Sequence, residues 1–416
     1  MLKNYIKIAF LVLKRRKFFT FISLFAISFT LVVLIVVSSI FDHVLAPMAP
    51  EINKDRSLTM FFAEIKGKDS IWNGNPGYKL LNDYARNLPG VELMSIHSES
   101  SPAISYVRGQ KIVSALKHTD GEYWKILQFK FLAGSPITTE DEKNANFVAV
   151  INQNTQEKFF PGQSAVGQQI EVDDQKFQVV GVVENVSQLR NSAYADIWVP
   201  LSTSKNAAYK TELMGSCIAT LLAKSRADFP AIKAEIAARM KTVEFPTELK
   251  KEYEQISCFA DTALEVLSRE AFNSVEANPN PSRFIGILLG LMTLFMLLPA
   301  INLININVSR ILERASEVGV RKAFGASSRT LVAQFITENL ILTSLGGLLG
   351  FVGSMLTLQL INHSSIIQYG SFQVNYRVFF YGIIITVFFS LFSGVYPAWR
   401  MSKLNPVEAL KGGSLR

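Results

Sequence analysis

The stretch that decides the fold runs from Asn302 to Gly350 and reads NLININVSRILERASEVGVRKAFGASSRTLVAQFITENLILTSLGGLLG. It ends one apolar run, continues as a charged connector over residues 309–330, and begins a second apolar run. The charged residues of the connector are mostly basic: Arg310, Arg314, Arg321, Lys322 and Arg329 stand against Glu313 and Glu317. Because Lys and Arg gather in the cytoplasmic connections between membrane spans, the connector is predicted to lie on the cytoplasmic side.

The spacing within the connector indicates a helix. Glu313, Glu317 and Arg321 recur every four residues and therefore share one helical face. The small residues from Ala323 to Ser328 are predicted to break that helix. We interpret the connector as a short helix at the cytoplasmic membrane surface that is presented to a soluble partner.

Four runs are longer than the roughly eighteen apolar residues that mark a membrane helix: 18–40, 284–308, 331–361 and 378–398. Residues 41–283 between the first two have ordinary globular composition and are long enough for one or two cores. The predicted fold class is a membrane protein of four transmembrane α-helices, one before and three after a large α+β extracytoplasmic domain. The other segments are a cytoplasmic amphipathic helix (1–17), a short extracytoplasmic loop (362–377) and a cytoplasmic tail (399–416).

Basic residues are concentrated beside the membrane segments. The amino terminus, the connector and the tail hold 15 of the 42 Lys and Arg but only 3 of the 34 Asp and Glu. This distribution sets orientation and does not indicate nucleic-acid binding. Both termini are therefore predicted to be cytoplasmic in a multi-pass protein of the bacterial inner membrane, with membrane lipids as its surroundings.

The outer domain is predicted to mix helices and strands. A helix over residues 78–88 ends at Pro89-Gly90, and residues 228–242 form an amphipathic helix. Two strands, 169–172 and 176–183, flank Asp173-Asp174-Gln175 and predict a hairpin.

No catalytic or metal-binding motif is present in the sequence. It lacks HExxH, CxxC and G-x-S-x-G patterns, so a metal site and a serine hydrolase are not expected. It also lacks a P-loop, so ATP and Mg²⁺ are expected to be bound by a partner chain and no cofactor by this one. Cys217 and Cys258 both fall in the outer domain, where either a disulfide or two separate buried thiols is compatible with the sequence.

The third span contains small residues at a spacing that permits close helix packing. Gly346, Gly350 and Ser354 recur every four residues and form one small face, either within a subunit or between two subunits. Glu338 lies in the same span, where a paired or solvated carboxylate and a proton relay are the two interpretations.

Several motifs resemble a known family. The core from Glu313 to Ala326, with its EVGVRKAFGA run, is similar to the FtsX-type permease domain of ABC transporters, and the close of the chain (YPAWR to NPVEAL, residues 396–410) is similar to that family's ending. In the outer domain, VAVIN at 148–152 and FQVVGVV at 177–183 resemble the periplasmic core domain of MacB-type permeases.

The resemblance implies a non-catalytic permease of four helices that pairs with itself, or with a related permease, and with a separate cytoplasmic ATPase. The connector would be the coupling helix, and its docking residues would be Glu313, Glu317, Val318, Gly319, Arg321, Lys322, Gly325 and Ala326. A periplasmic adaptor or an outer-membrane protein is a further partner that the resemblance suggests. The implied mechanism is mechanotransmission, in which ATP binding moves the outer domains without substrate crossing the bilayer.

Two functions follow from this resemblance. The leading one is export or efflux of a peptide, drug, lipid or lipoprotein, which the size and MacB-like order of the outer domain favour. The alternative is a transmembrane signalling scaffold that regulates an extracytoplasmic partner such as a cell-wall hydrolase. A membrane-anchored enzyme has little support, because no catalytic constellation is present.

Overall fold

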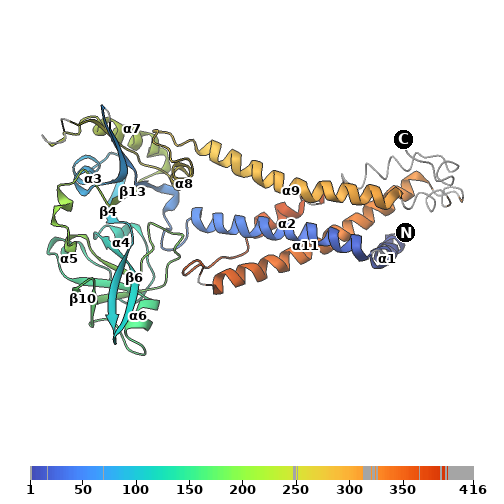
Figure 1. The fold of residues 1–416 in the computed structure, drawn as a ribbon, viewed down its shortest axis with the longest axis horizontal. Coiled ribbons are helices and arrows are strands. Elements are labelled where there is room, and N and C mark those ends of the chain that lie inside the picture. The colour runs from blue at the N-terminus through green and yellow to red at the C-terminus, as the bar shows by residue number, and fades with distance from the viewer. Residues whose placement is uncertain are drawn as a thin grey trace. The chain divides into compact units, whose positions relative to one another are not determined.

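The computed structural model describes residues 2–391 except 16, 69, 247–249, 251, 313–319, 321–323, 325–326, 365, 385–386 and 389–390. The chain divides into two compact units. We call them the membrane unit (1–42, 285–364 and 372–416) and the outer unit (43–284 and 365–371). The outer unit therefore contains a short segment that lies far along the chain, between two helices of the membrane unit (Figure 1).

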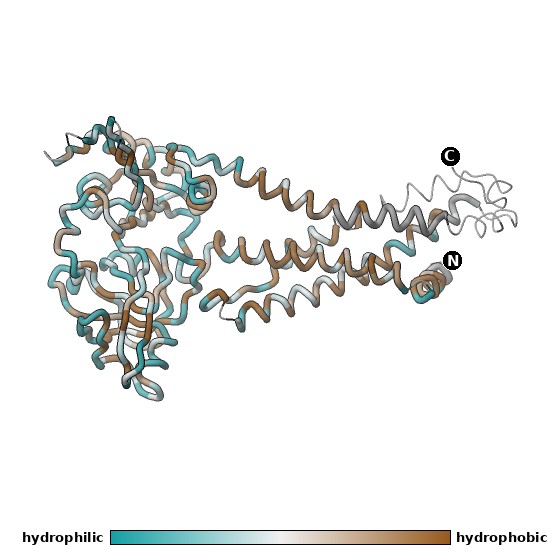
Figure 2. Tube along the Cα trace, in the orientation of Figure 1, coloured by the Kyte–Doolittle hydropathy of each residue, from teal (hydrophilic) through white to brown (hydrophobic). Residues whose placement is uncertain are grey.

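Long helices make up the described part of the membrane unit. They are α1 (Leu2–Arg15), α2 (Lys17–Leu45), α9 (Pro281–Leu312) and α11 (Ser328–His363). Two described stretches, Lys17–Leu45 and Val332–His363, are long and apolar enough to cross a membrane, and Pro281–Leu297 is a shorter apolar helix. Figure 2 shows hydrophobic residues following one another along most of α2. The expected fourth span, 378–398, lies only partly within the described residues.

Glycines of α11 allow it to pack closely against α2. A Cβ atom placed on Gly346 would come within 2.7 Å of Ile27, and one on Gly350 within 2.8 Å of Leu31. Ser354, on the same face, is fully buried, and its hydroxyl donates to the Phe351 carbonyl at 2.7 Å. The small-residue face therefore packs within the subunit, against α2, in this structure.

The outer unit consists of two lobes. The core lobe contains two sheets, with strand orders β1-β13-β4 and β12-β3-β2-β14. Its strands are β1 (Ser57–Met60), β2 (Ala63–Gly67), β3 (Ile71–Pro76), β4 (Val91–Ser98), β12 (Met214–Gly215), β13 (Cys217–Ala223) and β14 (Tyr253–Cys258). Its helices are α3 (Tyr78–Tyr84), α7 (Phe229–Met240) and α8 (Ala263–Phe272), with the 3₁₀ turns η1 (Lys54–Arg56), η3 (Ala207–Lys210) and η4 (Arg226–Asp228). One apolar cluster fills this lobe, and it includes Ile65, Leu80, Leu221 and Ile232.

The inserted lobe, residues 99–203, interrupts the core lobe between β4 and β12. It contains one mixed sheet with strand order β5-β6-β11-β8-β10-β7, in which β9 also pairs with β10. Its strands are β5 (Ser101–Val107), β6 (Gln110–Thr119), β7 (Phe131–Gly134), β8 (Val148–Asn152), β9 (Gln169–Val172), β10 (Gln175–Val183) and β11 (Ile197–Pro200). Its helices are α4 (Tyr123–Ile126), α5 (Thr139–Lys143) and α6 (Gln153–Phe159), and η2 (Leu201–Thr203) follows β11.

A second apolar cluster joins the lobes. Trp124 and Trp198 of the inserted lobe pack edge to face, with ring centroids 6.0 Å apart. The same cluster includes Leu93 and Leu222 of the core lobe. Because the burial of large aromatic side chains dominates core energetics, this cluster holds the two lobes as one body.

The local predictions for the outer domain are confirmed. The hairpin forms from β9 and β10, and Asp173 and Asp174 at its turn both have positive φ, 46° and 59°, as a tight hairpin turn requires. The two predicted helices appear as α3 and α7, with α3 ending earlier than expected. Cys217 and Cys258 are both buried free thiols, so the disulfide that the sequence left open is not formed in this structure.

Candidate functional site

Three segments of the outer unit continue directly into membrane helices, and each is held by a polar side chain that is buried in the first two segments and half-buried in the third. They are residues 43–50, which include the end of α2, residues 273–284, which include the start of α9, and residues 366–371 after α11. In a permease, these are the segments through which membrane helices can act on an outer domain. We therefore describe them as the candidate functional site.

Arg190 holds the segment that follows α2. Its Nη2 donates to the carbonyls of His43 at 2.9 Å and Ala46 at 3.4 Å. Its Nη1 donates to the Glu51 carboxylate at 2.8 Å and to the Met48 carbonyl at 3.3 Å. Arg190 is 2% exposed and Glu51 is 5% exposed. A guanidinium with five rigid donors is suited to fixing several acceptors of one irregular segment at once.

A buried lysine supports the loop that carries Arg190. Lys117 of β6 is fully buried, and its ammonium donates to the carbonyls of Asn191 at 2.7 Å and Ser192 at 2.9 Å. Burial lowers the pKa of Lys117 to about 7. The position of Arg190 is thus set by the sheet of the inserted lobe and not by the loop alone.

Helix α8, which precedes α9, has strong local start and stop signals. Thr262 and Glu265 form a capping box, in which the Thr262 hydroxyl accepts from the Glu265 N–H and the Glu265 carboxylate accepts from the Thr262 N–H. Asn273 ends the helix in the left-handed conformation, with φ 46°. The chain therefore turns sharply before it reaches α9.

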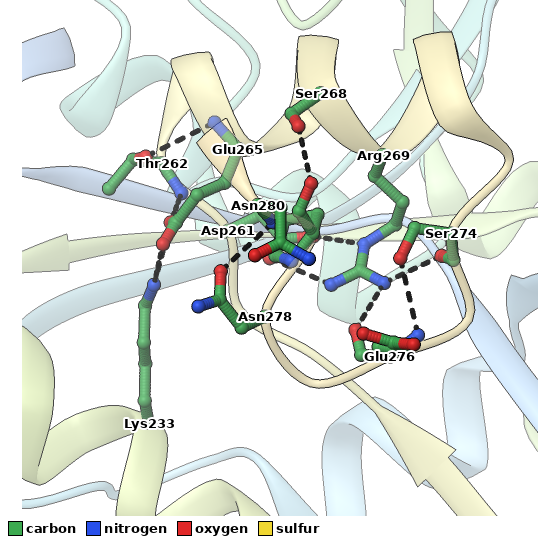
Figure 3. A network of polar contacts seen from close by, with 11 residues as sticks. Lys233, Asp261, Thr262, Glu265, Ser268, Arg269, Ser274, Glu276, Asn278 and Asn280 are labelled. Atoms are coloured by element: carbon green, nitrogen blue, oxygen red, sulfur yellow. Dashed lines mark hydrogen bonds and ion pairs between the residues drawn. The ribbon is translucent and has the colours of Figure 1, made fainter. Parts of the chain in front are cut away.

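Arg269 of α8 holds the segment that leads into α9 (Figure 3). Its Nε and Nη2 donate to the two carboxylate oxygens of Asp261 at 2.6 and 3.1 Å. Its Nη1 donates to the carbonyls of Ser274 at 2.8 Å and Glu276 at 2.9 Å. The guanidinium also lies 4.6 Å from the centroid of the Phe259 ring. Because Arg269 is only 2% exposed, these bonds form away from competing water.

Two further contacts extend this network (Figure 3). The Ser268 hydroxyl donates to the carbonyl of Pro279, two residues before α9 begins. The ammonium of Lys233 on α7 donates to the Glu265 carboxylate at 2.6 Å and so joins α8 to α7 within the core lobe. The segment that precedes α9 is therefore held by several hydrogen bonds.

Tyr369 holds the segment that follows α11. Its hydroxyl donates to Asp196 Oδ1 at 2.8 Å and accepts from the Asn154 side chain at 2.7 Å. The neighbouring Gln368 accepts from the Tyr194 hydroxyl through its side chain, and its carbonyl accepts from the Gln188 N–H at 3.0 Å. Burial and the nearby Asp196 carboxylate raise the pKa of Tyr369, so its hydroxyl keeps the proton that it donates.

Asp196 connects Tyr369 to the sheet of the inserted lobe. It lies just before β11 and is 7% exposed. Its second oxygen accepts from the Ala115 N–H at 2.8 Å, and Oδ1 also accepts from the Asn152 side chain at 2.8 Å. A carboxylate that is bonded to three elements gives the third segment a rigid base.

These three contacts were missed by the sequence analysis, and the residues it singled out for coupling lie elsewhere. Glu313, Glu317, Val318, Gly319, Arg321, Lys322, Gly325 and Ala326 all fall outside the described residues. Arg190, Arg269 and Tyr369 stand in no recognisable motif. The only local signal was the T-x-x-E capping box, which marks the start of α8 but not the partner of Arg269.

Models of two known domain families match two successive parts of the chain. A model of the MacB-like periplasmic core domain matches residues 20–239, more than half of the 416-residue chain. A model of the FtsX-like permease C-terminal region matches residues 289–406. The second match includes the connector.

The chain is also similar to individual proteins. The chain is 23% identical over 332 residues to the uncharacterized ABC transporter permease YknZ of Bacillus subtilis (strain 168), covering 78% of this chain and 77% of that one. It is 27% identical over 285 residues to the macrolide export ATP-binding/permease protein MacB of Bdellovibrio bacteriovorus, covering 67% of this chain but only 41% of that longer relative. The solved periplasmic region of MacB from Actinobacillus actinomycetemcomitans is 14% identical, with a TM-score of 0.37 over 53% of this chain and 94% of that one. The chain belongs to the MacB/FtsX-type family of ABC transporter permeases.

Proposed function

We propose that the chain is a non-catalytic permease subunit that couples ATP hydrolysis by a separate cytoplasmic ATPase to movement of its outer unit. This movement would drive export of a peptide, drug, lipid or lipoprotein by mechanotransmission. The observation that carries the proposal is the set of three polar contacts, centred on the buried Arg190 and Arg269 and the half-buried Tyr369, at the segments that continue into membrane helices. Multiply bonded attachments of this kind transmit displacement, whereas flexible linkers absorb it.

The proposed topology has four membrane spans, with both termini and the connector in the cytoplasm of a bacterial inner membrane. The connector would dock on the ATPase through the residues from Glu313 to Ala326. Two permease copies, identical or related, would assemble with two ATPase copies. A periplasmic adaptor or an outer-membrane protein would complete an export path.

The signalling scaffold is not favoured over export. Of the two sequence relatives described above, the one whose name states a function is an export protein, and the larger family match here is to the MacB-like periplasmic core domain. The cargo class stays open among peptide, drug, lipid and lipoprotein. ATP and Mg²⁺ would be held by the partner ATPase alone.

The test begins with purification of the full chain from its native membrane and identification of the proteins that accompany it. A P-loop ATPase is the expected companion. Gln163, which is exposed on the inserted lobe, is then replaced by cysteine and spin-labelled, while the two native cysteines are buried. The distance between labels of the two copies, measured by electron–electron resonance, should change when a non-hydrolysable ATP analogue is added. Absence of an ATPase, or an unchanged distance, would contradict the proposal.

A further inference from the structure

A cavity of about 300 Å³ lies within the outer unit, between the core lobe and the inserted lobe. Its lining comes from the end of α2, the segment from Glu51 to Phe61, Glu99 and Ser100 between β4 and β5, the loop that carries Arg190, strand β13 and helix α8. The volume is at the lower end of the roughly 300–1,000 Å³ that is typical of small-molecule pockets. The cavity thus adjoins the Arg190 contact and the helix that carries Arg269.

One part of the lining is apolar. Helix α8 contributes Val266 and Leu267. Leu189 comes from the inserted lobe, Ile218 from β13, and Phe61 from the residues between β1 and β2. Ile218 is buried, and the other four are half-buried. This wall can take up a hydrocarbon or aromatic group, which gains about 25 cal/mol for each Å² removed from water.

The other part of the lining is acidic, and its carboxylates differ in what they contact. Glu51 is saturated, because it pairs with Arg190 at 2.8 Å and with Lys54 at 2.7 Å. Among the described residues, the carboxylates of Glu99 and Glu270 have no hydrogen bond and no ion pair. Both residues are exposed, and their carboxylates can accept hydrogen bonds from a ligand in the cavity.

Glu99 and Glu270 also repel each other. The pKa of Glu270 is raised, first by burial and then by the charge of Glu99. Two like charges that repel each other are stabilised by a cation placed between them. Lys117 attracts the charge of Glu99, but its ammonium donates to two backbone carbonyls, and Lys54 is bonded to Glu51.

We propose that this cavity binds a small cationic amphiphile, with its ammonium group at Glu99 and Glu270 and its apolar body against Val266, Leu267 and Ile218. The proposal rests on the export function only for its physiological meaning, since binding itself needs no ATPase. An inorganic cation would use the carboxylates but leave the apolar wall in water. A neutral lipid chain would cover the apolar wall but leave the carboxylates without a cation. The mixed lining therefore selects a molecule that has both a cationic group and an apolar body.

The test uses the full chain in nanodiscs of zwitterionic lipid, with empty nanodiscs as the blank. The probe is 4-phenylbutylamine, and its binding is measured by calorimetry. Its neutral and anionic analogues, 4-phenylbutanol and 4-phenylbutyrate, are measured in the same way. We expect the amine to bind and both analogues to bind at least about tenfold more weakly.

Three variants locate the bound probe. E99Q/E270Q should weaken amine binding at least about tenfold, because it removes both unpaired charges without changing side-chain size. V266W should block the cavity and abolish binding while leaving the charge unchanged. E157Q/E171Q removes two exposed carboxylates of the inserted lobe that do not line the cavity, and it should bind the amine as the original chain does.

The outcomes that overturn the proposal are distinct from failure of the export function. No amine binding, equal binding of amine and butyrate, or unchanged binding by E99Q/E270Q would each exclude the site. Binding that is lost equally in E157Q/E171Q would show general surface attraction and would also exclude it. None of these results depends on an ATPase, so the permease function would stand or fall separately.

Discussion

The Tyr369 hydroxyl donates to the Asp196 carboxylate at 2.8 Å, although the two residues are 173 positions apart in the chain. Tyr369 follows α11, whereas Asp196 belongs to the inserted lobe. The bond therefore joins the segment between two membrane helices to the sheet of the outer unit. It belongs to the third of three such attachments, in which Gln368 also accepts hydrogen bonds from Tyr194 and Gln188.

Removing that hydroxyl should loosen the attachment without unfolding the outer unit. Tyr369→Phe keeps the ring but loses the bonds to Asp196 and Asn154. Hydrogen bonds that involve a charged group contribute about 1.5–3 kcal/mol. We expect faster hydrogen exchange of the amides of residues 366–371 and weaker stimulation of outer-unit movement by ATP. Tyr376→Phe is the matched control, since the Tyr376 hydroxyl has no bond among the described residues; equal exchange in the two variants would contradict the prediction.

Removing Arg190 should be far more damaging than removing a surface cation. Arg190→Met leaves Glu51 buried with only Lys54 and frees the carbonyls of the segment after α2. Breaking one side of a buried pair costs about 3–5 kcal/mol. Urea unfolding followed by tryptophan fluorescence reports this cost, because Trp124 and Trp198 are buried where the lobes meet.

The control for Arg190 is a cation in an exposed pair. Lys79 and Asp83 are 40% and 39% exposed and lie on one turn of α3. Lys79→Met should cost about 0.5 kcal/mol or less. Adding Glu51→Gln to Arg190→Met should recover part of the lost stability, because the uncompensated charge disappears. If Arg190→Met and Lys79→Met were equally stable, Arg190 would have no special role in holding this segment.

His97 should make the outer unit sensitive to acid. Burial, with a smaller contribution from Lys117, lowers the pKa of His97 from its ordinary 6.5 to about 3. Its Nδ1 donates to the Ser98 carbonyl, so its Nε2 accepts from the Thr220 hydroxyl in the neutral ring. Between pH 6.5 and 3 the unfolded chain binds a proton that the folded chain does not. The free energy of unfolding therefore falls as the pH drops through this window, by at most about 1.4 kcal/mol per unit.

The contribution of His97 is isolated by comparing variants. His97→Gln should flatten the acid limb of the stability curve, whereas His363→Gln, at an exposed residue outside the outer unit, should not. The comparison matters because burial raises the pKa of Asp120 to about 6, which favours the folded state as the pH falls and partly offsets His97. An unchanged slope in His97→Gln would show that another group controls acid unfolding.

The proposed topology places residues 185 and 327 on opposite sides of the membrane. Asn185 is exposed on the inserted lobe, and Ser327 caps the start of α11. Single cysteines at these positions should react with an impermeant maleimide from opposite sides of sealed vesicles. The buried native thiols, whose pKa is raised to about 12 by burial, should stay unreactive. Labelling of both sites from the same side would exclude the topology.

Whether a feature could be predicted depends on how far apart its interacting residues lie along the sequence. The hairpin at Asp173 and Asp174 was predictable, because its turn chemistry and its two strands are adjacent in the chain. The small face of α11 was predictable as a packing surface, but its partner was not, since Ile27 and Leu31 lie more than 300 residues earlier.

The three attachments were not predictable for the same reason. Arg190 meets Glu51 across 139 positions, and a lone arginine in a loop gives no sign that it is buried. Arg269 and Asp261 are only 8 positions apart, yet an arginine on a polar-looking helix is ordinarily solvated. By contrast, the connector can be predicted from sequence alone, because charge distribution and motif are local properties, and its docking residues lie outside the described part of the chain.

The connector should be required for coupling but not for folding. Replacing Glu317 and Arg321 by alanine removes one acid and one base from the face that the family resemblance assigns to ATPase docking. We expect the co-purified ATPase to be lost, or to hydrolyse ATP without moving the outer unit, while tryptophan fluorescence and urea unfolding of the outer unit stay unchanged. The control is Lys68→Ala/Glu254→Ala, which removes an exposed pair, 4.0 Å apart, from the outer unit. If the connector variant kept its ATPase and the ATP-dependent distance change, these residues would not form the coupling surface, and the ATPase would have to act through another cytoplasmic segment such as α1 or the tail.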